Sequence, residues 1–253
     1  MNHFETFLQL HNTGRPLLIG NCWDVGSAKL LEENGFKAIA TSSAAIANSL
    51  GYEDGENMPF DLLFETVKRI KQHISVPFSV DMERGYGNNI PRIIQNIERL
   101  HDIGVVGINI EDSTNDRKLQ SIDMFEKTIL SIAHHLSQKN ISIFINARTD
   151  AFLLQLPDAL AETRKRIEVY EAAGANGIFV PFITDENDIQ AITNTTGLPV
   201  NVLSVPRLPG IGILSSLGVR RVSLGSFLYR SINKEIVNKL HAIKQTQSFA
   251  GLF

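Results

Sequence analysis

The chain has 253 residues, of which 43% are hydrophobic and 20% are charged, and its formal net charge is −3 at pH 7. This balance excludes a disordered or collagen-like protein, and the lack of a basic excess argues against nucleic acid as a partner. The single cysteine, Cys22, excludes an internal disulfide and a multi-cysteine zinc site. No apolar run could span a bilayer and the first residues lack a signal-peptide pattern, so we expect a cytoplasmic protein that does not bind membranes.

Short apolar runs, typical of buried parallel strands, alternate along the chain with longer segments of helical periodicity. The predicted strands are 16–20, 37–41, 77–81, 105–110, 141–147, 177–180, 198–203 and 221–225. The predicted helices follow them at 25–34, 62–70, 93–103, 124–138, 158–173, 185–195, 210–217 and 228–243. Several helices are followed by glycine, which readily adopts the positive φ angle found at helix C-termini.

Eight consecutive strand–helix units predict an α/β fold, a single (β/α)8 TIM-type barrel made of residues 1–253. A doubly wound open sheet is the alternative, but it would normally contain fewer units. No linker or low-complexity stretch divides the chain, so we expect one domain.

Polar side chains at the carboxyl ends of the predicted strands are the candidates for chemistry, because reactive groups of parallel barrels lie there. They are Asn21, Trp23, Asp24, Thr41, Ser42, Ser43, Asp81, Glu83, Glu111, Asp112, Arg148, Thr149, Asp150, Asn201, Ser204 and Ser226. Acids after two adjacent strands, without a His or Cys cluster, favour a hard cation, Mg2+ or alternatively Mn2+. Arg148 after the next strand suits an anionic substrate. Alternatively, these acids could form purely structural ion pairs with Arg84 and Arg148. That interpretation is weaker, because the charges lie together at the ends of successive strands.

Four stretches of the sequence, in matching order and spacing, resemble the isocitrate lyase/phosphoenolpyruvate mutase superfamily. They are 81–87 (DMERGYG), 110–112 (IED), 147–151 (ARTDA) and the pair 41–45 and 50–54 (TSSAA and LGYED). The resemblance extends over nearly the whole chain. It implies a Mg2+-dependent enzyme that acts on a small 2-oxo or 2-hydroxy acid through a metal-stabilised enolate.

The resemblance also implies a metal site. It makes Asp81 the direct Mg2+ ligand, while Glu83 and Glu111 would hold the metal largely through its waters. Glu83 replaces the aspartate of the family's D-x-D, and its longer side chain fits a water-mediated role more easily than a direct one.

The remaining roles implied by the resemblance concern the substrate. Ser42 and the backbone amides of Ser43 and Ala44 would bind its carboxylate and oxo oxygens, and Arg148 would grip its anionic group. Asp54 would be a catalytic acid on a mobile segment, where two flanking glycines could provide hinge freedom.

Asn201, in the predicted strand 198–203, could add an amide to the substrate site, although a structural role at the strand end is an equal alternative.

At some positions the sequence departs from the family's motifs, and these departures limit which of the family's reactions the chain could catalyse. Lyase members carry a K-K/R-C-G-H loop after strand four, but residues 113–119 contain neither Cys nor His, and Asn115 is only a weak match to the loop asparagine of phosphonomutases. Strand six ends at Pro181, where phosphonomutase-type members have histidine and lyases have glutamate. The seven histidines avoid the predicted strand ends, so we expect them to be ordinary surface residues.

These observations favour cleavage of a C–C bond, by a lyase or decarboxylase. Chemistry at a P–C bond, as in a phosphonopyruvate-type mutase or hydrolase, is the alternative, and a protein that binds oxo acids without catalysis is another. Relatives in the family commonly form tetramers in which neighbours exchange the last helix. The apolar stripe of residues 231–243 fits such a homo-oligomer, a dimer or a tetramer, but also fits packing on the chain's own barrel.

Overall fold

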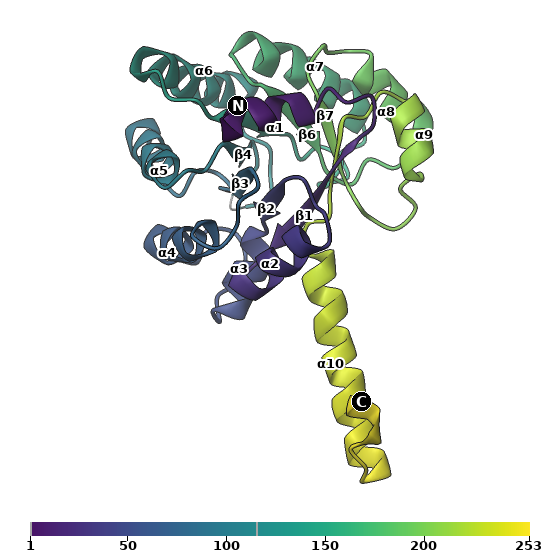
Figure 1. Cartoon of the computed structure of the whole chain (residues 1–253). Coiled ribbons are helices and arrows are strands. Elements are labelled where there is room, and N and C mark those ends of the chain that lie inside the picture. The colour runs from purple at the N-terminus through teal and green to yellow at the C-terminus, as the bar shows by residue number, and fades with distance from the viewer. Residues whose placement is uncertain (1, 115) are drawn as a thin grey trace.

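A computed structural model of the chain describes residues 2–114 and 116–253, and its centre is a closed barrel of parallel strands in the order β1 to β8 (Figure 1). The strands are β1 (Leu17–Cys22), β2 (Ile39–Thr41), β3 (Phe78–Asp81), β4 (Gly107–Glu111), β5 (Phe144–Arg148), β6 (Gly177–Val180), β7 (Val200–Leu203) and β8 (Arg221–Ser223). Pairing of β8 with β1 closes the barrel. The TIM-type fold predicted from the sequence is therefore confirmed.

Helices connect and surround the strands, and among the described residues none is long and apolar enough to cross a membrane. They are α1 (His3–Leu10), α2 (Val25–Glu33), α3 (Ser43–Ser49), α4 (Phe60–Lys71), α5 (Ile90–Asp102), α6 (Ile122–Lys139), α7 (Ala159–Ala172), α8 (Glu186–Thr193), α9 (Ile211–Ser216), α10 (Phe227–Thr246) and the short 3-10 helix η1 (Ala250–Leu252). The glycines after the predicted helices have positive φ angles, at positions 35, 104, 174 and 218.

The strands are apolar on their outer face because helices cover it. Val80, Ile108 and Val202 belong to one large core that also includes Leu63 of α4 and Ile97 of α5. The barrel interior is partly polar: Asn146 of β5 and Arg221 of β8 both donate to Asn109 of β4. Polar side chains on this inner face can therefore take part in chemistry at the carboxyl end of the strands.

Helix α1, which the sequence analysis did not predict, packs against one end of the barrel (Figure 1). Asn2 caps it through a reciprocal capping box with Glu5. Phe7 of α1 is fully buried in a second apolar cluster, and its ring meets that of Phe144 edge-on at 5.5 Å. His11 follows α1, is 1% exposed and stacks on Phe144, so the prediction of a surface histidine is wrong here. Burial, followed by the charge of Arg221, lowers the pKa of His11 to about 3, and the ring is neutral at physiological pH.

Helix α10 extends away from the barrel, and none of its described residues is buried (Figure 1). Its apolar side chains Ile232, Ile236 and Leu240 are between 40% and 55% exposed. The alternative that this helix packs along its own barrel is therefore wrong for most of its length.

Replacing Phe7 with alanine tests how much the packing of α1 against the end of the barrel contributes to stability. We expect Phe7→Ala to lower the free energy of unfolding by about 3–5 kcal/mol, because the ring is fully buried and leaves a cavity. Phe182→Ala is the matched control, because its ring is 44% exposed; we expect it to change stability by no more than about 1 kcal/mol. Urea denaturation measures both. Equal losses in the two variants would contradict the assigned role of α1.

Candidate active site

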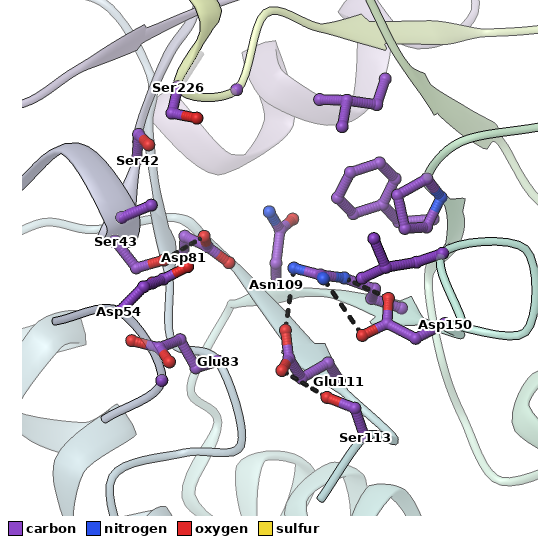
Figure 2. A pocket seen from close by; sticks show the side chains of 18 of the residues that line it. Ser42, Ser43, Asp54, Asp81, Glu83, Asn109, Glu111, Ser113, Asp150 and Ser226 are labelled. Carbon is purple, nitrogen blue, oxygen red and sulfur yellow. Dashed lines mark hydrogen bonds and ion pairs between the residues drawn. The ribbon is translucent and has the colours of Figure 1, made fainter. Parts of the chain in front are cut away.

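A cavity of about 690 Å³ opens where the strands end, and polar side chains from successive strands line it (Figure 2). Asn21 comes from β1, Asp81 from β3, Glu111 from β4 and Arg148 from β5. The residues that the sequence analysis selected at strand ends are thus largely brought together, as the barrel geometry requires.

Asp81 lies at the end of β3 beside the start of α3. Its Oδ2 accepts a hydrogen bond of 2.7 Å from Ser43 Oγ, and its backbone N–H donates to Thr41 Oγ1 at 2.9 Å. Its Oδ1 is buried and has no partner among the residues that the structure describes. A buried carboxylate oxygen without a partner is costly unless another group reaches it.

Glu83 follows β3 with a positive φ of 48°, which turns its side chain into the cavity wall. Tyr86 Oη donates to Glu83 Oε1 at 2.6 Å. Burial raises the pKa of Glu83 to about 8; the bond from Tyr86 opposes this rise, and the charges of Asp54, Asp81 and Glu111 add to it.

Glu111 and Arg148 form the central ion pair of the site. Arg148 Nη1 lies 2.8 Å from Glu111 Oε2, and Ser113 Oγ donates to Glu111 Oε1 at 2.6 Å. Arg148 also forks onto Asp150, with bonds of 2.7 and 3.1 Å from Nε and Nη2. Burial raises the pKa of Glu111 to about 7, although the charge of Arg148 opposes that rise. Burial alone would lower the pKa of Arg148, but Glu111, Asp150 and Asp81 raise it, so the guanidinium stays charged.

Asp112 belongs to a supporting network behind the cavity. It is fully buried and accepts hydrogen bonds from Arg166 Nη1 at 3.0 Å, from Tyr170 Oη at 2.8 Å and from the backbone N–H of Asp150 at 3.0 Å. Because Asp150 in turn holds Arg148, this network fixes the guanidinium from outside the barrel.

Asp54 lies in the loop between α3 and α4 and faces the acids of the cavity (Figure 2). Partial burial, followed by the charge of Asp81, raises its pKa. Arg84 ties down the same loop, because its Nη2 donates to the Gly55 carbonyl at 2.9 Å and lies 3.3 Å from Glu56 Oε2. Gly51 and Gly55 have φ angles of 82° and 95°, which other residues would adopt only with strain.

The N-terminus of α3 supplies hydroxyl and backbone groups to the cavity. Ser42 caps the helix through a bond of 3.3 Å from the Ala45 N–H, and Ser42, Ser43 and Ala44 line the cavity. The first N–H groups of a helix have no partner within the helix, so those of Ser43 and Ala44 are available to an oxygen ligand.

One predicted substrate residue, Asn201, does not lie in the cavity wall. Asn201 is 1% exposed inside the barrel, where its Oδ1 accepts a bond from Ser223 Oγ at 3.2 Å. It does not line the cavity, which reaches only as deep as Ser223. Asn115 lies outside the described residues.

Other lining residues were not selected from the sequence. Asn109 and Ser113 lie on or just after β4, while Arg117 and Arg230 come from a loop and from α10. Asn109 lies within its strand rather than after it, and only the strand register could have revealed its depth.

The wall opposite Asp81 and Ser43 is mostly apolar, as the nearly all-carbon side chains of Figure 2 show. Its apolar residues are Leu153, Leu154, Phe179, Pro181, Leu203 and Phe227. Polar contacts with a ligand are therefore concentrated on the side of β2 to β5.

Comparison with known proteins assigns the family. The sequence model described as phosphoenolpyruvate phosphomutase matches residues 7–244. An uncharacterised protein of Mycobacterium tuberculosis is 34% identical over 224 residues, which cover 88% of this chain and 83% of that protein. An oxaloacetate decarboxylase of Bradyrhizobium is 29% identical over 235 residues, which cover 89% of this chain and 79% of that enzyme.

Solved structures agree with this assignment. A crystal structure from Burkholderia cenocepacia, provisionally assigned as a phosphonomutase, superposes with a TM-score of 0.90 at 34% identity and covers 94% of this chain and 99% of that one. A phosphonopyruvate hydrolase in complex with oxalate and Mg2+ has the same fold, with a TM-score of 0.86 at 20% identity over 99% of this chain and 89% of that one. The chain therefore belongs to the isocitrate lyase/phosphoenolpyruvate mutase superfamily.

Proposed function

We propose that this protein is a Mg2+-dependent enzyme that cleaves a C–C bond of a small 2-oxo or 2-hydroxy carboxylic acid, as a lyase or a decarboxylase. The observation that carries the proposal is the arrangement of Arg148, a guanidinium fixed by Glu111 and Asp150, on the cavity floor close to Asp81. It offers an anion site beside a cation site, which is what an oxo acid and a divalent metal require together. The related decarboxylases make oxaloacetate the first substrate to test.

The carboxylates of Asp81, Glu83 and Glu111 fit a divalent cation that only one of them contacts directly. Asp81 Oδ1 is buried without a partner in the described chain, and the charges of Asp54, Asp81 and Glu111 each raise the pKa of Glu83. A bound cation would relieve both conditions. Within residues 2–114 and 116–253 no three His, Cys, Asp or Glu side chains converge closely enough to bind a metal directly. Asp81 would therefore hold Mg2+ directly, with Glu83 and Glu111 acting through water.

When bound, Mg2+ would supply a Lewis acid that polarises the oxo oxygen of the substrate. Arg148 would bind the substrate carboxylate with the N–H groups that Glu111 and Asp150 leave free. Ser42 Oγ and the N–H groups of Ser43 and Ala44 would orient the same anion from the other side. These donors are fixed by the fold before the substrate arrives, so they can stabilise negative charge as the C–C bond breaks.

Asp54 is the proposed proton carrier. Its raised pKa keeps a larger share of the carboxyl protonated near neutral pH than in an ordinary aspartate. It lies on a loop flanked by glycines, so it could approach the carbon atom that needs a proton as the loop closes.

The acid cluster predicts a distinct pH dependence of stability in the metal-free protein. A carboxyl group with a raised pKa in the folded state binds its proton more tightly there, so stability falls as pH rises from the unfolded pKa towards the folded one. For Glu83 this window extends from about 4.5 to about 8. We expect Glu83→Gln to stabilise the metal-free protein at pH 8 by about 1–3 kcal/mol and to have little effect at pH 5.

Urea denaturation in EDTA measures this effect. Glu65→Gln, an exposed change on α4, is the control and should leave the pH profile unchanged. If Glu83→Gln and the parent lose the same stability between pH 5 and 8, the pKa of Glu83 is not raised in the folded protein.

A substrate panel tests the reaction. Purified protein with Mg2+ is mixed with oxaloacetate, substituted malates, isocitrates and phosphonopyruvate, and the products are followed by NMR. Carbon fragments are the expected result. A change confined to the ³¹P spectrum would instead assign P–C chemistry, and binding without turnover throughout the panel would assign a non-catalytic oxo-acid-binding protein.

Asp81→Ala tests the metal site in the same protein. We expect Mg2+-dependent binding of oxalate, measured by calorimetry, to weaken by about 100-fold or more, because loss of an outer-shell partner alone costs roughly 10–100-fold. Asp61→Ala, which removes an exposed acid paired with Arg99, is the control. If Asp81→Ala binds Mg2+ and oxalate as tightly as the parent, the metal assignment is wrong.

We also propose that the protein is a homo-oligomer, a dimer or a tetramer, in which α10 packs on a second copy and is exchanged between subunits. The support is the stripe of Ile232, Ile236 and Leu240 on a helix without any buried residue.

Charge substitution on α10 tests this assembly. We expect Ile236→Glu with Leu240→Glu to reduce the assembly to monomers at micromolar concentration, measured by analytical ultracentrifugation. The control adds the same two negative charges at exposed polar positions of the helix, Asn238→Glu with Gln245→Glu, and should keep the parent's mass. A monomeric parent would refute the proposal.

A further inference from the structure

Arg221 is a buried cation that forms no ion pair with a carboxylate among the residues that the structure describes. It lies at the start of β8 inside the barrel, is 1% exposed and is among the largest fully buried side chains. No acid in the described ranges forms an ion pair with it, and its Nη1 has no hydrogen-bond partner there. Burying a guanidinium in this way is unfavourable, so its position calls for a compensating role.

The polar contacts of Arg221 are made with two residues of the cavity floor. Its Nε donates to Ser223 Oγ at 3.4 Å, and its Nη2 donates to Asn109 Oδ1 at 3.5 Å. Ser223 and Asn109 both line the cavity, whereas Arg221 does not. On another side, the guanidinium carbon lies 5.9 Å from the ring of Phe7. The guanidinium therefore lies beneath the floor and contacts it through long hydrogen bonds.

Asn109 is oriented by donors from below. Its Oδ1 accepts a bond of 2.8 Å from Asn146 Nδ2 in addition to the one from Arg221. Because Arg221 has only donors to offer, the oxygen of the Asn109 amide is the atom that must face it. The amide nitrogen then points elsewhere. In the described chain Asn109 Nδ2 has no hydrogen-bond partner, yet it is not among the fully buried polar atoms, so the cavity reaches it.

The strand register puts this nitrogen beside the proposed metal ligand. Asn109 of β4 pairs with Asp81 of β3 and with Asn146 of β5, and the pair formed by Glu111 and Arg148 lies two residues further along the strands. Figure 2 shows the Asn109 side chain in the middle of the floor, between Asp81 and Glu111. A ligand oxygen bound between Asp81 and Arg148 would lie directly above it.

We propose that Asn109 binds the substrate by donating a hydrogen bond from Nδ2 to a carboxylate or oxo oxygen, and that Arg221 and Asn146 are positioning residues that hold its amide in that orientation. The inference rests on the proposed function, because it takes an oxo acid as the ligand. It gives a role to the cation that lies without an acidic partner, among the described residues, beneath the cavity floor: the guanidinium donors orient the amide of Asn109.

Oxalate binding in the presence of Mg2+, measured by calorimetry on the full-length protein, tests the role of Asn109. We expect Asn109→Leu, which keeps a similar volume but removes the donor, to weaken binding by about 10- to 100-fold, as expected for a hydrogen bond to a charged group. Asn176→Ala is the control, because this half-buried amide only accepts a bond from the Ile145 N–H outside the cavity. It should bind oxalate like the parent, even if it unfolds at a lower temperature.

A double-mutant cycle separates a positioning role of Arg221 from a purely structural one. We expect Arg221→Met to weaken oxalate binding several-fold in the parent and to have no further effect in Asn109→Leu. Arg221→Lys, which retains a cationic donor, should recover part of the loss. If Arg221→Met does not fold, Asn146→Leu takes its place in the same cycle.

The outcomes are distinguishable. A parent that binds no oxalate refutes the proposed function, and this inference with it. A parent that binds oxalate while Asn109→Leu binds equally well overturns only the role of Asn109. Equal losses from the Arg221 substitution in both backgrounds would show that Arg221 supports the fold alone.

Discussion

Several carboxylates can be buried in one cavity only if cations lie among them, and in this barrel Arg148 is the cation at the centre. It contacts Glu111 at 2.8 Å and Asp150 at 2.7 Å, and its charge opposes the rise in the pKa of Glu111. Asp150 is fixed in turn by Asp112, which Arg166 and Tyr170 hold from outside the strands. A continuous network of ion pairs and hydrogen bonds thus runs from α7 to the cavity floor and fixes the position of Arg148, the proposed binding group for an anion.

The acids on the other side of the cavity, Asp81 and Glu83, form no ion pair with any residue that the structure describes. Glu83 contacts Tyr86 but lies among like charges, and Asp81 keeps one oxygen free in the described chain. The site is therefore electrostatically divided. One half is neutralised by arginine, and the other half contains the acids to which we assign the proposed Mg2+.

The barrel and most strand-end residues were predictable because both follow from local patterns. Apolar runs identify the strands, and the end of each run identifies the residues that reach the cavity. Helices α1 and α3 were missed, since each is short and adjoins a predicted strand or strand end. His11 was expected at the surface because the position of α1 against the barrel depends on tertiary packing with Phe144, which no local pattern encodes.

Two of the asparagines on the barrel strands, Asn109 and Asn201, show what local sequence patterns do not encode. Asn201 was selected as a residue near the end of its predicted strand, 198–203, but the register places it level with Arg221, below the cavity. Asn109 was overlooked because it lies within an apolar run, yet the register places it level with Asp81 at the floor. Depth along the barrel axis is set by how the strands stagger, and this can be read only from the pairing of one strand with the next.

We propose that Arg148 and Asp81 together form a combined site for a metal and an oxo-acid anion. A crystal structure of the protein with Mg2+ and oxalate tests it most directly. We predict oxalate bound between Arg148 and the start of α3, with Mg2+ touching Asp81 and the same oxalate. Oxalate bound elsewhere, or bound here with no metal at Asp81 under saturating Mg2+, would contradict the account.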